Sequence, residues 1–227
     1  MFDSYRIMTP GEAQEIVLWA QAQPWEQGKA RTAEATGTIK KNEELKGGDE
    51  LEGIGRKFWT HERLIADHAP KRMLLPRLNR YGVGQEYQRH GDAAFMAGTV
   101  RTDLACTLFL SHPSTYDGGE LCVEDDAGGF QEIKGGAGMC VVYPCHMPHW
   151  VRPVTRGERI SAITWIESCY RDLEQRSLQR RFLNLLREME ADPDPKLGHW
   201  RTTLGTIHGR LQRMWLDHDW KAARKAQ

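Results

Sequence analysis

The chain has 227 residues and a mass of 26.0 kDa, which is enough for one domain with appendages and a sizeable core. Its 31 Lys and Arg residues balance 31 Asp and Glu residues, so the chain as a whole has no electrostatic footprint for nucleic acid or for an anionic membrane. We therefore expect neither a nucleic-acid partner nor a membrane partner.

The cysteines and the N-terminus indicate the cellular setting. Five cysteines are an odd number, and they fit neither C-x-x-C nor a zinc-finger spacing, which disfavours a disulfide framework. The N-terminus M-F-D-S-Y-R-I-M has an early acid and no apolar core, unlike a signal peptide, and no apolar run reaches 18 residues. These features predict a reduced, cytoplasmic protein.

The first third of the chain predicts helices and short strands. Thr9-Pro10-Gly11-Glu12 has the pattern of a capping box, so a helix is expected from there to about Ala22. Residues 25–45 contain glycines and polar runs, and indicate one or two strands with loops. A second helix is predicted over residues 49–68, ended by Pro70, and an extended region over residues 73–87.

The middle of the chain is dense in strand signals. Leu104 to Leu110 is a continuous apolar run, typical of a strand buried on both faces, and Glu120 to Glu124 alternates as a half-buried strand does. Turn residues recur every 8 to 12 positions, which is typical of a β-sandwich or barrel with the helices packed outside it. The remaining predicted strands cover residues 130–134, 139–143, 150–154 and 159–166.

Beyond Tyr170 the pattern changes to two helices. The first is expected over residues 172–189, and the second carries an apolar stripe that runs from Trp200 to Trp215 at near-heptad spacing. Docking of this stripe on the protein's own core is the favoured interpretation, and a homodimer seam is the alternative. We expect a core domain over residues 1–170, with its β-structure over about 71–168, and a helical extension over 171–227.

Candidate metal ligands stand in two separate stretches. Y-G-V-G-Q-E-Y-Q-R-H-G-D ends in His90 and Asp92 with one residue between them. In an extended chain, residues i and i+2 project from one face, so the imidazole and the carboxylate converge. His149, in Y-P-C-H-M-P-H-W, is the best third ligand, with His146 as its rival. Two His and one carboxylate are typical of non-haem Fe(II) oxygenases.

Four blocks of sequence resemble the Fe(II)- and 2-oxoglutarate-dependent oxygenases, and more narrowly the PKHD-type hydroxylases, which are related to the prolyl 4-hydroxylases. The resemblance covers roughly residues 25–172 and implies a double-stranded β-helix, a jelly-roll fold of two antiparallel sheets that close over the metal. The blocks are N-R-Y-G-V-G-Q-E-Y-Q-R-H-G-D, R-T-D-L-A-C-T-L-F-L-S, Y-D-G-G-E-L and Y-P-C-H-M-P-H-W-V-R-P-V-T-R-G-E-R.

By matching positions, the resemblance implies that His90, Asp92 and His149 bind Fe(II), and that Arg159 binds the remote carboxylate of 2-oxoglutarate. A planar guanidinium fits a carboxylate in bidentate fashion. Ser161 lies two residues after Arg159 on the predicted strand and therefore faces the same way. Tyr81 matches a tyrosine that bonds the co-substrate in prolyl hydroxylases. Ascorbate is a candidate reductant.

The reaction implied is hydroxylation of an unactivated C–H bond, with O2 consumed and 2-oxoglutarate converted to succinate and CO2. Related halogenases lack the carboxylate at the position of Asp92, so its presence favours hydroxylation. The substrate class stays open between a small molecule, an amino acid and a peptidyl residue, because fold does not specify substrate. The sequence runs that form the entrance, about residues 26–48 and 93–100, carry no readable motif.

Two other functions remain as alternatives. Oxidative demethylation of nucleic-acid bases is disfavoured by the zero net charge. A non-catalytic, cupin-like metal-binding or sensor module is disfavoured by Arg159, because a metal store needs no guanidinium near the metal. Near the expected site, Trp150 and Trp165 are interpreted as core more readily than as pocket, and the run from Lys40 to Asn42 is either at the substrate entrance or a solvated charge run.

Overall fold

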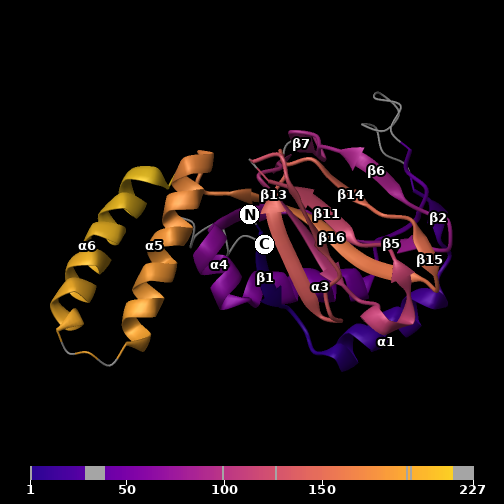
Figure 1. Ribbon diagram of the computed structural model, residues 1–227, viewed down its shortest axis with the longest axis horizontal. Helices are drawn as coiled ribbons and strands as arrows, with labels where there is room; N and C mark the ends of the chain where they lie inside the picture. Colours follow the sequence, from indigo (N-terminus) through magenta and orange to yellow (C-terminus); the bar gives the residue numbers. More distant parts are fainter. Residues whose placement is uncertain are drawn as a thin grey trace. The chain divides into compact units, whose positions relative to one another are not determined.

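The computed structural model describes residues 2–28, 39–98, 100–125, 127–192, 194 and 196–216. Part of the segment predicted to form strands over 25–45 lies outside these residues, as does the C-terminal tail. The chain, coloured by sequence position in Figure 1, forms two compact units. One comprises Met1–Thr60 and Met73–Glu167, and the other His61–Arg72 and Ser168–Gln227. The domain boundary predicted at residue 170 stays a prediction.

Helix α1 (Pro10–Gln21) begins as the sequence predicts. The Glu12 N–H donates to Thr9 Oγ1 at 3.2 Å, and the Thr9 N–H donates to Glu12 Oε2 at 2.7 Å, so the capping box is complete. Lys57 of helix α3 (Asp49–Thr60) makes a 2.6 Å ion pair with Glu12, which joins the two helices along one side of the strands in Figure 1.

The single helix predicted over residues 49–68 is wrong, because the chain forms two helices there. Helix α3 ends at Thr60 and helix α4 (Glu62–His68) begins after His61. His61 has extended backbone angles, and its Nδ1 accepts a 3.1 Å hydrogen bond from the Leu64 N–H. The imidazole therefore serves as the N-cap, a position that Ser, Thr, Asp and Asn usually occupy.

Seven strands of the first unit lie in one large antiparallel sheet with the order β1-β13-β9-β16-β5-β3-β2. All residues of β9 are buried, as the apolar run in the sequence predicts. The strands are β1 (Asp3–Arg6), β2 (Glu26–Gln27), β3 (Glu43–Lys46), β5 (Arg77–Tyr81), β9 (Leu104–Phe109), β13 (Met139–Pro144) and β16 (Arg159–Ser168).

A second antiparallel sheet has the order β12-β11-β14-β6. Strand β11 is buried more deeply than the half-buried strand that the sequence predicts. It lies between two neighbouring strands, and Cys122 is fully buried. The single strand predicted over 150–154 is in fact two strands that flank Pro153, which has no N–H to donate. The sheet contains β6 (Tyr87–His90), β11 (Leu121–Glu124), β12 (Phe130–Ile133) and β14 (His149–Val151).

Two short antiparallel ribbons and one 3-10 turn complete the first unit. The ribbons are β7 (Phe95–Met96) with β8 (Val100–Arg101), and β10 (Asp117–Gly118) with β15 (Val154–Arg156); the turn is η1 (Pro113–Thr115). Apolar side chains from both sheets, among them Phe109, Val123 and Tyr143, pack into one buried cluster. The unit is therefore mainly β, with two antiparallel sheets sharing a core, as predicted.

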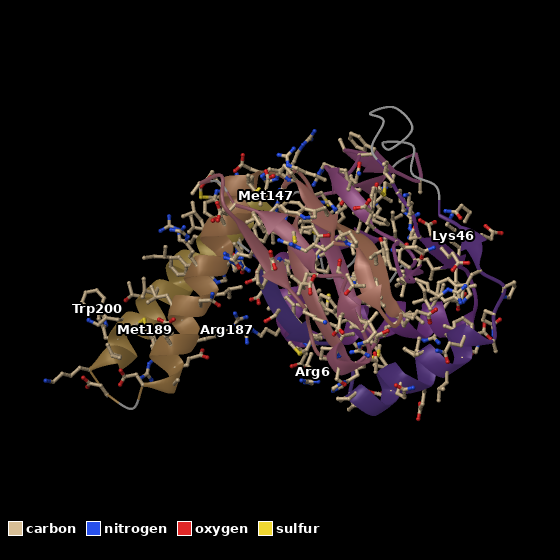
Figure 2. The ribbon with its side chains drawn as sticks, turned by 45° about the vertical axis from the view of Figure 1, so that its right-hand side comes forward. Arg6, Lys46, Met147, Arg187, Met189 and Trp200 are labelled. Carbon is tan, nitrogen blue, oxygen red and sulfur yellow. The ribbon has the colours of Figure 1, made fainter. Side chains whose placement is uncertain are left out.

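The second unit contains α4, α5 (Leu173–Ala191), α6 (Leu197–Trp215) and most of the short strand β4 (Pro70–Met73). Helices α5 and α6 run side by side (Figure 1) and are joined by a 2.8 Å hydrogen bond between Gln179 and His208. Trp200 projects from α6 with 57% of its surface exposed (Figure 2). The homodimer seam on this helix stays a prediction. Among the described residues, no helix is long and apolar enough to cross a membrane.

Candidate metal and anion site

The three predicted metal ligands come together in the first unit. His90 ends β6 and His149 begins β14, and the two residues lie directly opposite each other in the antiparallel pair. Asp92 follows β6 by two residues, and its Oδ2 lies 3.8 Å from His149 Nε2. One ligand atom from each of the three side chains lies within 4.8 Å of the others, close enough to share one metal ion.

Backbone carbonyls fix the orientation of both imidazoles. His90 Nδ1 lies 2.8 Å from the carbonyl oxygen of Gln88, and His149 Nδ1 lies 3.0 Å from that of Met147. Because a carbonyl can only accept, Nδ1 carries the proton in each ring, and the lone pair is on Nε2. Each histidine therefore turns Nε2 toward the other ligands, and a backbone carbonyl two residues earlier in the chain fixes its ring.

The surroundings of His90 keep it neutral. Burial lowers the pKa of His90 to about 3, and the neighbouring His149 adds to the shift. The ring of Tyr87 stacks on His90 with the centroids 3.6 Å apart, and the Tyr143 ring meets His149 edge-on at 5.0 Å. Metal ions bind the unprotonated imidazole, so the burial that lowers the pKa of His90 favours the form that binds.

The carboxylate is held by a residue that sequence reasoning placed in the core. Trp165 is 6% exposed, and its Nε1–H donates to Asp92 Oδ2 at 2.9 Å. The sequence does contain a signal for this role: Arg159, Ser161, Ile163 and Trp165 alternate along β16, and all four line the same cavity. Trp150, the other candidate, lies outside the lining of this cavity.

Replacing Trp165 with phenylalanine is expected to weaken divalent metal binding by about 10- to 100-fold, because Asp92 loses the donor that orients it. A competition titration with a metal-binding dye measures the effect. Trp150→Phe serves as the matched control, since that ring packs on Phe130 instead, with centroids 5.0 Å apart. Equal metal affinity in Trp165→Phe and the wild type would show that the hydrogen bond has no such role.

Arg159 lies in the same cavity with unusual hydrogen bonding. Its side chain is 1% exposed, and its Nη1 donates to Ser161 Oγ at 2.8 Å. Within the described residues, neither Nε nor Nη2 has an acceptor in good hydrogen-bond geometry, and the Tyr116 hydroxyl is close enough to the guanidinium to interact with it but makes no well-formed hydrogen bond. A buried cation with two unused donors is costly without an anion, so this arrangement is suited to binding one.

Tyr81 and Ser161 lie beside Arg159 and offer hydroxyl donors to an anion bound there. The guanidinium carbon of Arg159 is 5.4 Å from the centre of the Tyr81 ring, and the two residues are paired between β16 and β5. Burial raises the pKa of Tyr81, so its hydroxyl keeps a proton to donate. Ser161 accepts from Arg159 through its oxygen, which leaves its own O–H for a bound anion.

One cavity of about 690 Å³ connects these groups. His90, Asp92 and His149 line it, together with Arg159, and apolar side chains such as Leu121 and Val151 complete the wall. The volume falls within the range usual for small-molecule sites.

The rival ligand and the charged run are also placed by the structure. His146 is exposed and does not belong to the group of converging ligand atoms, whereas His149 is buried and does. Of the run from Lys40 to Asn42, only Lys40 lines the cavity, Lys41 is exposed, and buried Asn42 donates to Asn79 at 2.8 Å. The run is thus neither wholly solvated nor wholly at the entrance.

The sequence is similar to those of known proteins. A profile described as the 2OG-Fe(II) oxygenase superfamily matches residues 76–167. A PKHD-type hydroxylase of Acidovorax ebreus is 34% identical, with 92% of this chain and 96% of that protein covered. A PKHD-type hydroxylase of Paraburkholderia phymatum is 33% identical, with 93% and 96% covered.

The fold has a counterpart among solved structures. A prolyl-4-hydroxylase of Pseudomonas putida superimposes with a TM-score of 0.54 at 18% identity, and the match covers 74% of this chain and 92% of the other. At this identity the likeness concerns the fold alone. Together with the two antiparallel sheets, it confirms the double-stranded β-helix expected from the sequence.

Proposed function

The chain belongs to the PKHD-type hydroxylases of the 2OG-Fe(II) oxygenase superfamily, and from that premise we propose that it hydroxylates an unactivated C–H bond with release of succinate and CO2. The balanced reaction consumes one O2 and one 2-oxoglutarate for each hydroxyl group formed. The substrate is proposed to be a small molecule, an amino acid or a peptidyl residue.

The donor set fits the metal of this family. Two neutral imidazole nitrogens and one carboxylate are the facial triad of non-haem Fe(II) oxygenases, and we assign His90, His149 and Asp92 to it. The two carbonyl contacts fix the imidazoles, and Trp165 fixes the carboxylate, so the site is held in place before the metal binds.

Arg159 carries the proposal for the co-substrate. 2-Oxoglutarate has a carboxylate at each end, and the unused Nε–H and Nη2–H groups of Arg159 are the donors that one of them needs. Ser161 and Tyr81 contribute hydroxyl donors beside the guanidinium. Because Arg159, Ser161 and Tyr81 are buried away from water, their hydrogen bonds to the carboxylate would be stronger than the same bonds at the surface.

When bound, Fe(II) and 2-oxoglutarate would supply the activation of O2, with one oxygen atom entering the C–H bond and the other entering succinate. The protein's own residues bind and orient these groups. Apolar side chains of the cavity, including Leu121 and Val151, exclude water from the reacting atoms. The expected use of ascorbate as a reductant stays a prediction.

Neither alternative function has a comparable observation in its favour. A metal store or sensor leaves the two unused donors of Arg159 unexplained. A base demethylase requires a surface for the nucleic-acid backbone, and the sequence has balanced charges. The absence of nucleic-acid and membrane partners stays a prediction.

Anaerobic addition of Fe(II) and 2-oxoglutarate is expected to produce a weak visible charge-transfer band in the wild-type protein. Admission of O2 should then release succinate and CO2 in equal amounts, measured by chromatography and by trapping of labelled CO2. Zn(II) in place of Fe(II) is the control, because it has no redox chemistry. A wild-type protein that gives neither the band nor succinate would contradict the proposal.

A further inference from the structure

Three cationic side chains form ion pairs with one buried carboxylate in the wall of the cavity. Glu44 is 1% exposed, and its carboxylate pairs with Lys40, with Lys46 at 2.8 Å and with Arg77 at 3.5 Å. All three cations line the cavity that holds the triad. One carboxylate cannot neutralise three cations, so this group, which we call the basic wall, has a net charge of about +2.

The basic wall leads from solvent toward the triad. The Lys46 side chain is 52% exposed and lies at the surface in Figure 2, that of Arg77 is 25% exposed, and that of Lys40 is 7% exposed. An anion entering the cavity therefore meets positive charge at the rim first and deeper in the wall afterwards.

Aromatic rings connect the basic wall to the ligands of the triad. Lys40 Nζ lies 5.1 Å from the centre of the Tyr87 ring, which stacks on His90. The Arg77 guanidinium carbon lies 4.5 Å from the centre of the Trp165 ring, which donates to Asp92. Because Arg77 is stacked and partly buried, its guanidinium is oriented before any ligand binds.

The basic wall is separate from the anion site at Arg159. On the paired strands β5 and β16, Tyr81 lies opposite Arg159, whereas Arg77 lies opposite Ile163. Four residues along a strand correspond to roughly 13 Å. The two guanidinium groups also face different rings: that of Arg159 lies over Tyr81 and Phe109, and that of Arg77 lies over Trp165. The positive charge there is thus left for another ligand.

We propose that the substrate carries a carboxylate or phosphate group that binds to Arg77 and Lys46, an inference that rests on the proposed hydroxylase function. Binding there would hold the anionic end beside Trp165 and leave the C–H bond to be hydroxylated near the triad. The ribbon β7–β8 contributes Phe95 and Met96 to the same cavity, and these side chains suit an apolar body on the substrate.

Hippurate, its neutral amide hippuramide, and phenyl phosphate test this inference. Each is titrated into the anaerobic complex of the full-length protein with Fe(II) and saturating 2-oxoglutarate, and binding is followed by the shift of the thermal unfolding midpoint. We expect at least one of the two anions to bind, and the amide to bind at least about tenfold more weakly. Comparison of hippurate with phenyl phosphate tells whether a carboxylate or a phosphate is preferred.

Arg77→Gln is expected to weaken binding of the preferred anion by about tenfold or more. Arg80→Gln is the matched control: Arg80 lies on the same strand but is not among the residues lining the cavity, and it pairs with Glu43 at 2.7 Å. Lys46→Gln, at a half-exposed side chain, keeps the test valid if Arg77→Gln fails to fold.

The charge-transfer band in the same samples separates two kinds of failure. A wild-type protein without the band would overturn both the hydroxylase function and the inference. A wild-type protein that shows the band but binds hippuramide as well as the anions, or binds none of them, would overturn the inference alone. Unchanged anion binding in both Arg77→Gln and Lys46→Gln would have the same consequence.

Discussion

Replacement of His149 with alanine is expected to lower Fe(II) affinity by more than about 100-fold, since loss of a direct ligand costs more than loss of a residue that only orients one. The two remaining ligands, His90 and Asp92, cannot complete the triad. The anaerobic charge-transfer band and succinate release should both disappear. A metal competition titration and the spectrum of the Fe(II)–2-oxoglutarate complex measure the two effects.

His146→Ala is the matched control for that variant. His146 lies three residues earlier in the same segment, but it is exposed and stands apart from the converging ligand atoms. We expect its metal affinity and its band to equal those of the wild type. If His146→Ala lost the metal while His149→Ala retained it, the assignment of the third ligand would be reversed.

The triad could be predicted from the sequence because two of its members are local. His90 and Asp92 are two residues apart, so extended backbone alone brings them to one face. The third member required the resemblance to a known family as well, since no local rule pairs β14 with β6. The structure brings His149 opposite His90, as the assignment requires, and the role of His149 as a metal ligand stays a prediction.

Other features depend on long-range pairing or on unusual chemistry, and the sequence could not specify them. Glu44, Lys46 and Arg77 of the basic wall come together because β3 and β5 pair in a register that places Lys46 opposite Arg77. The break between α3 and α4 has no proline or glycine to mark it, and depends on an imidazole as the cap. Alternation along β16 does predict that Trp165 shares a face with Arg159, but not which face is hollow.

Arg159→Met is expected to raise the KM for 2-oxoglutarate by at least about 30-fold. Truncating one partner of a buried, hydrogen-bonded charge pair costs roughly 2–5 kcal/mol, and 2 kcal/mol corresponds to about 30-fold. Methionine keeps much of the volume and fits irregular space, so the cavity wall beside Tyr81 and Phe109 should stay filled. Steady-state kinetics and titration of the charge-transfer band measure the change.

The same variant has a stability signature that a merely structural arginine would not give. Without 2-oxoglutarate, the wild-type protein buries a guanidinium with two unused donors, so its removal should leave the free energy of unfolding unchanged or raise it. With 2-oxoglutarate at 100 times the wild-type Kd, the wild type should gain about 2.7 kcal/mol and Arg159→Met no more than about 0.9 kcal/mol, given a 30-fold weaker affinity. Arg156→Met, at an exposed residue paired with Asp117, should respond to 2-oxoglutarate as the wild type does. Denaturant unfolding with and without the co-substrate measures both changes in the free energy of unfolding. The contrary result is that Arg159→Met is strongly destabilised without ligand and is still stabilised by 2-oxoglutarate as the wild type is. That result would make Arg159 a core residue and place the anion site elsewhere.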